Sequence, residues 1–476
     1  MKLKFVIKNF KSIKNTELIL RKGVNILIGP NGSGKTCVLS SLQFVRDVFR
    51  FGSAQALARS GGAKRVYRRN ASKMVFSMSD DYGKRVYRRK PHPCKFYWEI
   101  QIAQAGEEKI ATVVKESFVI KCNVANSEKQ MFLLEIDRSK SIKGKTKMEL
   151  CDHSLFGRDL FSVWDVYFKK RNKTQIVEAF KNEILKHILD TATNSPDKSF
   201  FSEIVNLDRK ITGVYNHFLF LNEYNILPDI ARAATEQLPY SQMTPNGGSV
   251  SEVIHALENK HFGKLEEADY AYMEDYHRIP YFLRSSYPYP RYMFRHRYYR
   301  HRGKGSEIDA ALDNINRELS AAVKPISSIS VAIDPTSGKR FVVFKSEDNT
   351  FYPEEVSDGT VKWLCILVSL FVPFSKVYLL EEPENFLHPW MQQRLIDIMR
   401  EQSEKNDTIF LLSSHSSTIL NAAYPSEVLV VKQDSSGTQL TNIESEEELS
   451  QILSQSDFQL GDLWVSGAIG GVPADE

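Results

Sequence analysis

The segment Gly29–Thr36 constrains the fold more than any other part of the chain, because it fits the pattern G-x-x-x-x-G-K-[ST] of phosphate-binding loops. Apolar residues at 24–28 predict a strand just before it, and residues 35–49 predict a helix just after it. A strand, a glycine-rich turn and a helix are the context that this pattern requires. We therefore expect a domain of the α/β class that binds a nucleotide.

Each part of this phosphate-binding loop has an expected role. The glycines allow backbone amides to curl around phosphate oxygens, and the following helix directs its positive end toward them. We expect Lys35 to reach the β- and γ-phosphates of ATP, and the hydroxyl of Thr36 to bind Mg²⁺. The residues expected to contact the nucleotide are Asn31, Gly32, Ser33, Gly34, Lys35 and Thr36. A glycine turn without a ligand is the alternative, and the motifs that follow argue against it.

A second motif begins with the apolar run 377–380, which ends in Glu381 and Glu382. A carboxylate at the end of a buried strand can hold the magnesium shell, and its neighbour can deprotonate a water that attacks the γ-phosphate. We assign the magnesium role to Glu381 and the role of general base to Glu382. Paired acids in a solvated loop are the alternative reading.

Two further motifs extend this pattern. The apolar run 408–412 leads into Ser-Ser-His415, which would place an imidazole at a neighbouring strand end, where it can sense the γ-phosphate. The segment Ser357–Thr360 precedes an apolar helix expected at 361–371, so Ser357 and Gly359 mark a second anion-binding helix N-terminus. Taken alone, His415 would more often be a structural residue, and the segment Ser357–Thr360 would be only a helix cap.

The order of predicted elements divides the chain into regions. Residues 1–150 form an N-terminal lobe, with an irregular connection at 51–95 and antiparallel strands at 96–136. Residues 151–325 have helical periodicity, and the α/β pattern resumes at 326–476 with a hairpin, an apolar helix and buried strands. We expect a split P-loop head, with a mixed sheet and flanking helices, interrupted by a mainly helical domain.

Composition limits the class of protein. With 42% hydrophobic and 25% charged residues the chain is typical of globular proteins, and no run approaches the roughly 18 apolar residues of a membrane span. The N-terminus enters strand-like sequence at once, so we expect a cytoplasmic protein without a membrane partner. The five cysteines lack metal-binding spacing, so we expect reduced thiols rather than a disulfide framework or a zinc site.

One segment interleaves cations with aromatic side chains, at residues 278–304. Cations neutralise phosphates and aromatic rings stack on bases, so this segment is a candidate contact for nucleic acid or for an acidic, DNA-mimicking phage protein. A proline-rich loop whose rings pack on the helical domain is the alternative. The two copies of Lys-Arg-Val-Tyr-Arg-Arg, at 64–69 and 84–89, are weaker candidates for the same kind of contact. His296 and His301 lack acidic or cysteine partners, so no metal site is expected there.

Together the motifs resemble the ABC-type ATPases of the SMC, RecF and OLD group. The matching blocks, in order, are Lys8–Ile13, Gly29–Thr36, Ser357–Thr360, Leu379–Pro389 and Ser413–Ser416. The resemblance implies a homo-oligomer in which Ser357 and Gly359 of one subunit contact the γ-phosphate held by Lys35 of another. The family usually has Asp at the position of Glu381. Magnesium often keeps waters between itself and such a carboxylate, so we expect the extra methylene to be tolerated, with slow hydrolysis as the alternative. The glutamine of the family's Q-loop has two candidates, Gln43 and Gln101.

Two segments, Glu382–Pro389 and 461–471, resemble stand-alone ATPase subunits of antiphage systems such as PARIS and Septu. OLD proteins proper carry a C-terminal Toprim nuclease, and the residues after His415 are too few for one. The resemblance implies a sensor and scaffold that controls a separate nuclease or toxin effector. The alternative is a RecF- or SMC-like repair ATPase that acts directly on DNA, although no heptad repeat of an SMC arm is present.

Overall fold

The computed structural model describes residues 2–87, 90–105, 110–124, 127–138, 143–148, 186, 189–190, 193–201, 221–237, 242–259, 310–372, 375–443 and 458–469. The chain divides into two compact units that are interleaved in the sequence. Unit 1 consists of Met1–Lys22, Gly29–Leu221 and Val430–Thr441, and unit 2 of Gly23–Ile28, Asn222–Leu429 and Asn442–Glu476. Most of the helical region expected at 151–325, and all of the basic segment 278–304, lie outside the described residues.

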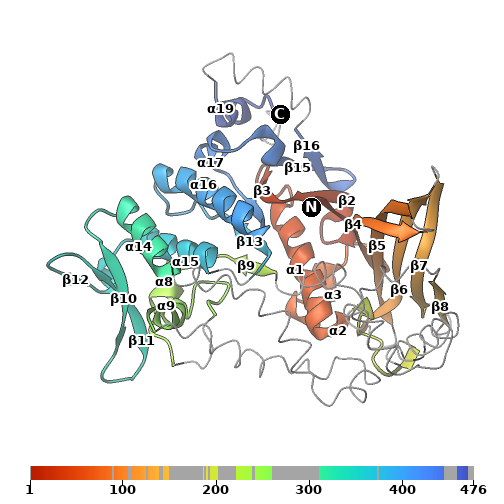
Figure 1. The fold of residues 1–476 in the computed structure, drawn as a ribbon, viewed down its shortest axis with the longest axis horizontal. Helices are drawn as coiled ribbons and strands as arrows, with labels where there is room; N and C mark the ends of the chain where they lie inside the picture. Colours follow the sequence, from red (N-terminus) through yellow and green to blue (C-terminus); the bar gives the residue numbers. More distant parts are fainter. Residues whose placement is uncertain are drawn as a thin grey trace. The chain divides into compact units, whose positions relative to one another are not determined.

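Unit 1 is built on a seven-stranded antiparallel sheet with the order β2-β1-β4-β5-β6-β7-β8 (Figure 1). Its strands are β1 (Lys2–Phe10), β2 (Ile13–Arg21), β4 (Lys73–Tyr87), β5 (Lys90–Ala105), β6 (Ile110–Val124), β7 (Ser127–Asp137) and β8 (Lys143–Met148). Helix α1 (Lys35–Phe51) packs on this sheet through Phe44, whose ring lies 5.5 Å from those of Phe10 and Phe76. The same unit contains the end of β15 (Val428–Asp434) and nearly all of β16 (Gly437–Asn442).

The irregular connection expected at 51–95 is wrong. That stretch contains α2 (Ser53–Arg59), α3 (Ala63–Val66), all of β4 and the first part of β5. Met74, Phe76 and Met78 are buried and alternate with other residues, which is the two-residue period of a strand. Flanking basic residues obscure this period in the sequence.

The cysteine expectation also needs a correction. Cys94, which lies opposite Cys122 in the register of β5 and β6, is disulfide-bonded. Cys37 and Cys365 are free thiols, as expected. The spacing of the cysteines in the sequence did not predict this disulfide.

Unit 2 contains four parallel strands in the order β3 (Gly23–Ile28), β14 (Ile409–Ser413), β13 (Val377–Glu381) and β9 (Asn222–Tyr224). The interior residues of β14 and β13 are buried apolar runs, as is typical of a parallel sheet covered on both faces. Helix α16 (Pro389–Asn406) contacts β3 and β14, and it also contacts α15 (Asp358–Phe371) (Figure 1). The expected α/β fold with mixed and antiparallel sheets is confirmed.

The rest of unit 2 is a smaller sheet with helices beside it. Strands β10 (Ser328–Ile333), β11 (Arg340–Lys345) and β12 (Thr350–Phe351) form an antiparallel sheet, which confirms the expected hairpin. Helices α9 (Val250–Glu258) and α14 (Ala311–Ala322) contact this sheet. The remaining elements are α8 (Pro228–Arg232), η4 (Pro353–Glu355), α17 (Ser417–Asn421), η5 (Pro425–Glu427) and α19 (Leu460–Val465). No helix in the described part of the chain is long and apolar enough to cross a membrane.

Candidate nucleotide-binding site

The carboxyl ends of three parallel strands lie in register in unit 2. Leu27 of β3 pairs with Ser413 of β14, and Ser413 pairs with Glu381 of β13. The amide of Ser414 donates to the carbonyl of Leu27 at 3.0 Å, which continues this alignment past the strand end. The phosphate-binding loop starts at Gly29, directly after β3. Ligands of open α/β sheets bind at such carboxyl ends, so this edge is the candidate site.

The phosphate-binding loop has the geometry of an anion site. Lys35 is only 7% exposed, and its Nζ donates to the carbonyls of Gly29 at 2.8 Å and Pro30 at 3.2 Å. Gly34 has a φ of +106°, and a Cβ there would lie 2.2 Å from Oγ1 of Thr438. The turn that leads into α1 therefore requires glycine.

The same loop fits the phosphates of ATP. The first turn of α1 has no acidic residue that would neutralise its positive end. Oγ of Ser33 is buried and has no hydrogen-bond partner among the described residues, so an anion in the loop would supply one. Asn31, Gly32 and Thr36 are exposed, and a hydroxyl such as that of Thr36 is an oxygen ligand of the kind that Mg²⁺ takes.

Glu382 and His415 lie together at the sheet edge. Oε1 of Glu382 is 3.7 Å from Nε2 of His415, and Oε2 accepts a hydrogen bond from Asn385 at 3.0 Å. Both side chains remain partly open to solvent, at 41% for Glu382 and 31% for His415. A partly exposed carboxylate held by an amide and an imidazole can orient and deprotonate a water molecule. The structure thus brings together the two residues that the sequence assigned to catalysis.

The carboxylate of Glu381 has an amide neighbour that the sequence did not predict. Asn225, directly after β9, lies with Nδ2 3.5 Å from Oε2 of Glu381, at the outer limit of a hydrogen bond. The Q-loop candidates Gln43 and Gln101 both belong to unit 1, and the amide of Gln101 donates to Glu99. In unit 2 the side-chain amide beside Glu381 is therefore that of Asn225. A three-residue strand such as β9 is too short to give a periodic signal.

The segment Ser357–Thr360, here called the signature segment, begins α15. Ser357 is exposed, and its Oγ accepts a hydrogen bond from the amide of Thr360 at 3.2 Å, so the helix starts three residues before its expected position. A Cβ on Gly359 would lie 2.4 Å from the carbonyl oxygen of Phe386, in the turn that follows Glu382. Glycine at this position allows the signature segment to pack against that turn.

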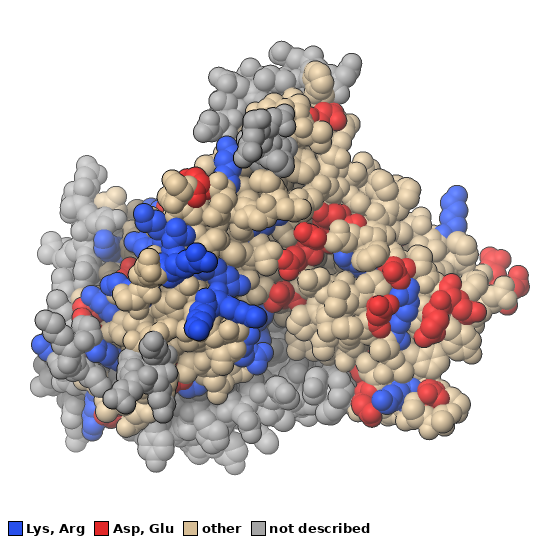
Figure 2. Space-filling model, turned by 180° about the vertical axis from the view of Figure 1, so that it is seen from behind, with Lys and Arg blue, Asp and Glu red and all other residues tan. Residues whose placement is uncertain are grey.

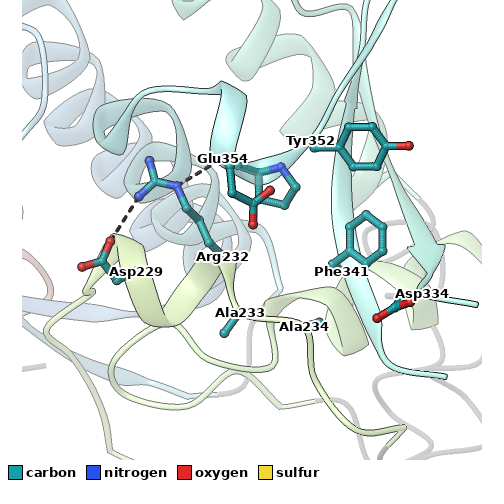
Figure 3. Close-up of a pocket in the computed structure, with 9 residues that line it drawn as sticks. Asp229, Arg232, Ala233, Ala234, Asp334, Phe341, Tyr352 and Glu354 are labelled. Atoms are coloured by element: carbon teal, nitrogen blue, oxygen red, sulfur yellow. Dashed lines mark hydrogen bonds and ion pairs between the residues drawn. The ribbon is translucent and has the colours of Figure 1, made fainter. Parts of the chain in front are cut away.

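Arg232 of α8 fixes the chain that leads into the signature segment. Its guanidinium donates to the carbonyls of Pro353 and Val356, both at 2.9 Å, and lies 2.6 Å from Asp358. Figure 3 shows this arginine between Asp229 and the Pro353 loop, at the side of a pocket of about 430 Å³. No sequence signal marks this role of Arg232, because Pro353 and Val356 are more than a hundred residues away from it.

Two buried charged residues lie beside Glu382 and His415 and were also missed. Nζ of Lys362, in α15, donates to the backbone carbonyl of Glu382 at 3.1 Å. Glu384 accepts hydrogen bonds from Oγ of Ser414 at 2.8 Å and from the amide of His415 at 2.7 Å. Burial lowers the pKa of Lys362 below its ordinary value and raises the pKa of Glu384 above its own.

The comparisons with known sequences agree with a nucleotide site. The AAA ATPase domain family matches residues 1–420. The DNA replication and repair protein RecF of Erwinia tasmaniensis is 45% identical over 53 residues, which are 11% of this chain and 15% of that protein. RecF of Yersinia enterocolitica is 39% identical over 72 residues, which are 15% of this chain and 18% of that protein. The chain thus spans less than a fifth of the RecF proteins that it matches.

Solved structures of SMC heads align over most of the chain at low identity. The SMC head bound to the C-winged helix domain of ScpA covers 94% of this chain and 98% of its own, at 13% identity and a TM-score of 0.45. The SMC head domain from Thermotoga maritima covers 93% of this chain and 100% of its own, at 12% identity and a TM-score of 0.36.

Proposed function

The chain belongs to the AAA ATPase domain family, and from this premise we propose that it binds ATP with Mg²⁺ and hydrolyses the ATP. One observation carries the proposal. In unit 2 the ends of β3, β14 and β13 are in register at Leu27, Ser413 and Glu381, and the phosphate-binding loop continues from the first of these strands. The loop and the acids that hydrolysis needs therefore leave from one edge of one sheet.

The proposed roles follow from the chemistry of each side chain. Lys35 and the amides of the loop bind the phosphates, and Mg²⁺ held by Thr36 and Glu381 would neutralise phosphate charge. Glu382 accepts a proton from the attacking water. At the same time the water oxygen bonds to the γ-phosphorus, and the bond between the γ-phosphorus and the bridging β-phosphate oxygen breaks. His415, close to Glu382, hydrogen-bonds the γ-phosphate. The products are ADP and phosphate.

We further propose that a second copy of the chain completes the site. Ser357 is exposed at the N-terminus of α15, where its hydroxyl caps the amide of Thr360. The resemblance to SMC, RecF and OLD proteins supplies the expectation that this end contacts the γ-phosphate held by another subunit. The exposure of Ser357 supports this arrangement.

The experiment for ATP hydrolysis compares nucleotide binding and phosphate release in two variants. Lys35→Ala should abolish ATP binding, because the loop loses its cation. Glu382→Gln should bind ATP as tightly as the native protein but release phosphate about 10²- to 10⁴-fold more slowly, the usual contribution of a general base. Glu354→Gln, at an exposed acid of unit 2, is the control. Native phosphate release by Glu382→Gln would show that the base is assigned wrongly.

For the cellular role we propose a sensor and scaffold subunit of an antiphage system that controls a separate nuclease or toxin. The support is the resemblance of Glu382–Pro389 and of 461–471 to such subunits. Co-expression with the products of neighbouring genes should yield an effector complex that forms with ATP and is lost in Lys35→Ala. A locus that encodes no effector, together with a chain that stays monomeric with ATP and Mg²⁺, would count against this role.

A second candidate, an ATPase that acts directly on DNA, is favoured by a basic cluster in unit 1. The cluster consists of Lys8, Lys11, Lys64, Arg65 and Arg69. Backbone bonds from Lys11 to Val66 at 2.8 Å and from Arg68 to Asn9 at 3.2 Å join residues 64–69 to the end of β1. Figure 2 shows that Lys and Arg side chains gather in one area of the molecular face.

The two candidates differ in how they depend on salt. Direct DNA binding should weaken steeply as salt rises, and Lys64→Glu with Arg65→Glu should weaken it uniformly across sequences, because backbone phosphates are the ligands. DNA binding that is absent, or that neither salt nor these substitutions changes, would remove this second candidate.

A further inference from the structure

We propose that Glu384 is a positioning residue, whose buried carboxylate holds His415 beside Glu382 and so sets the geometry of the hydrolytic pair. The inference rests on the proposed function, because Glu384 acts through His415. Neither the sequence motifs nor the resemblance assigns a role to this glutamate.

The hydrogen bonds of Glu384 end on the loop that carries the histidine. Glu384 is 8% exposed, and its Oε1 accepts from Oγ of Ser414 and from the backbone amide of His415. Oγ of Ser414 in turn accepts from the amide of Ser416 at 3.0 Å. One carboxylate oxygen thus fixes successive residues of the chain after β14. Such charge-assisted bonds are short and strong, so the backbone of His415 is held in place.

Glu384 also belongs to a charge pair that reaches the signature helix. Its Oε2 is buried without a hydrogen-bond partner in the part of the chain that the structure describes. The buried ammonium of Lys362, which is 3% exposed, is attracted electrostatically to both Glu384 and Glu382. The Lys362 ammonium donates to the backbone carbonyl of Glu382. The two buried charged groups are therefore hydrogen-bonded to the backbone on either side of the pair: Lys362 to the carbonyl of Glu382, and Glu384 to the amide of His415.

A purely structural acid is the alternative, and it differs from a positioning residue in a measurable way. A structural acid affects activity through folding, whatever residue stands at 415. A positioning residue affects activity through the side chain that it places, so its removal costs little once that side chain is gone.

The test is a double-mutant cycle of Glu384→Ala and His415→Ala, read as kcat and KM for ATP by phosphate release, with melting temperature as the fold check. Glu384→Ala should lower kcat about 10- to 100-fold, because a misplaced catalytic group costs on this order, with little change in KM. In the His415→Ala background the same substitution should change kcat by less than about 3-fold, since coupled residues are not additive. Glu252→Ala, which removes a buried, ion-paired carboxylate elsewhere in unit 2, is the control and should act independently of His415.

Two conservative variants keep the test decisive if Glu384→Ala does not fold. Glu384→Gln keeps an oxygen that can accept from Ser414 and His415, so it should retain most of kcat. Glu384→Asp keeps the charge but withdraws the oxygen by one methylene, so it should lose kcat. The opposite ranking would show that charge rather than position matters and would overturn the proposal.

The outcomes separate this inference from the proposed function. Independent, multiplying effects of Glu384→Ala and His415→Ala overturn the inference and leave ATP hydrolysis by Glu382 intact. Native activity of His415→Ala overturns it as well, because nothing is then left to position. Failure of the proposed function would appear elsewhere, as a native protein that releases no phosphate from ATP.

Discussion

Gly34 shows how a single residue shapes the phosphate-binding loop. Its φ of +106° lies in the left-handed region, and the nearest atom to a Cβ there is Oγ1 of Thr438. That oxygen is held by hydrogen bonds to Ser12 at 2.7 Å and to Gln433 at 3.0 Å. The threonine cannot move aside without breaking them. Gly34 therefore fixes both the backbone of the loop and its packing.

Gly34→Ala should abolish nucleotide binding and lower the free energy of unfolding by more than about 2 kcal/mol, since a collision adds to the roughly 1–2 kcal/mol of left-handed backbone. Titration with ATP and urea denaturation measure the two effects. Gly338→Ala is the control, because Gly338 also has a positive φ, of +70°, with no atom within 4 Å of a Cβ. It should show the backbone cost alone and normal ATP binding, and equal effects of the two substitutions would contradict this account of Gly34.

Helices α14, α15 and α16 are joined by hydrogen bonds to one buried residue, Glu318. Glu318 of α14 accepts two hydrogen bonds from the guanidinium of Arg394 in α16, both at 2.9 Å. Its backbone carbonyl accepts from the indole of Trp363 in α15 at 3.4 Å. Hydrogen bonds from Arg394 hold the pKa of Glu318 below its ordinary value. These contacts support the helix that presents Ser357.

This pair predicts a pH-dependent stability. A carboxyl group whose pKa is lowered by folding stabilises the protein above its unfolded pKa, and this stability is lost as the pH falls through the lower, folded value. At pH 7, Glu318→Gln should therefore cost about 2 kcal/mol of unfolding free energy, as for hydrogen bonds to charged groups. The cost should shrink as the pH falls below about 4.

Urea denaturation across this pH range gives the measurement. Glu401→Gln removes the more exposed partner of Arg394 and should cost less than about 1 kcal/mol. A loss in Glu318→Gln that is the same at every pH would show that packing, rather than charge, joins these helices.

Elements that depend on local pattern could be predicted from the sequence, and contacts between distant residues could not. Local sequence patterns predict the buried runs of β13 and β14 and the cap at Ser357. They also predict Lys35 and Glu382, which follow strands. Lys362 and Glu384 do not, because their partners at the site lie 20 and 31 positions away. Asn225 was missed because β9 is only three residues long.

In the whole molecule, the chain passes from unit 2 into unit 1 at the phosphate-binding loop. Strand β3 belongs to unit 2, and the loop that leaves it, Gly29–Thr36, belongs to unit 1. The loop is therefore joined through the backbone to the sheet that carries Glu382. If Ser357 of a second copy supplies the remaining contact, ATP is bound between two copies of the chain and holds them together, as well as being the substrate.

Active-site complementation between copies tests most directly whether two copies share one ATP site. Lys35→Ala removes the phosphate-binding cation, Ser357→Arg blocks the signature segment, and each variant alone should be inactive. A mixture should regain ATP hydrolysis, up to roughly a quarter of the native rate, because half of randomly formed dimers are mixed and each holds one intact site. A mixture no more active than its separate components, or native activity in Ser357→Arg alone, would show that each copy completes its own site.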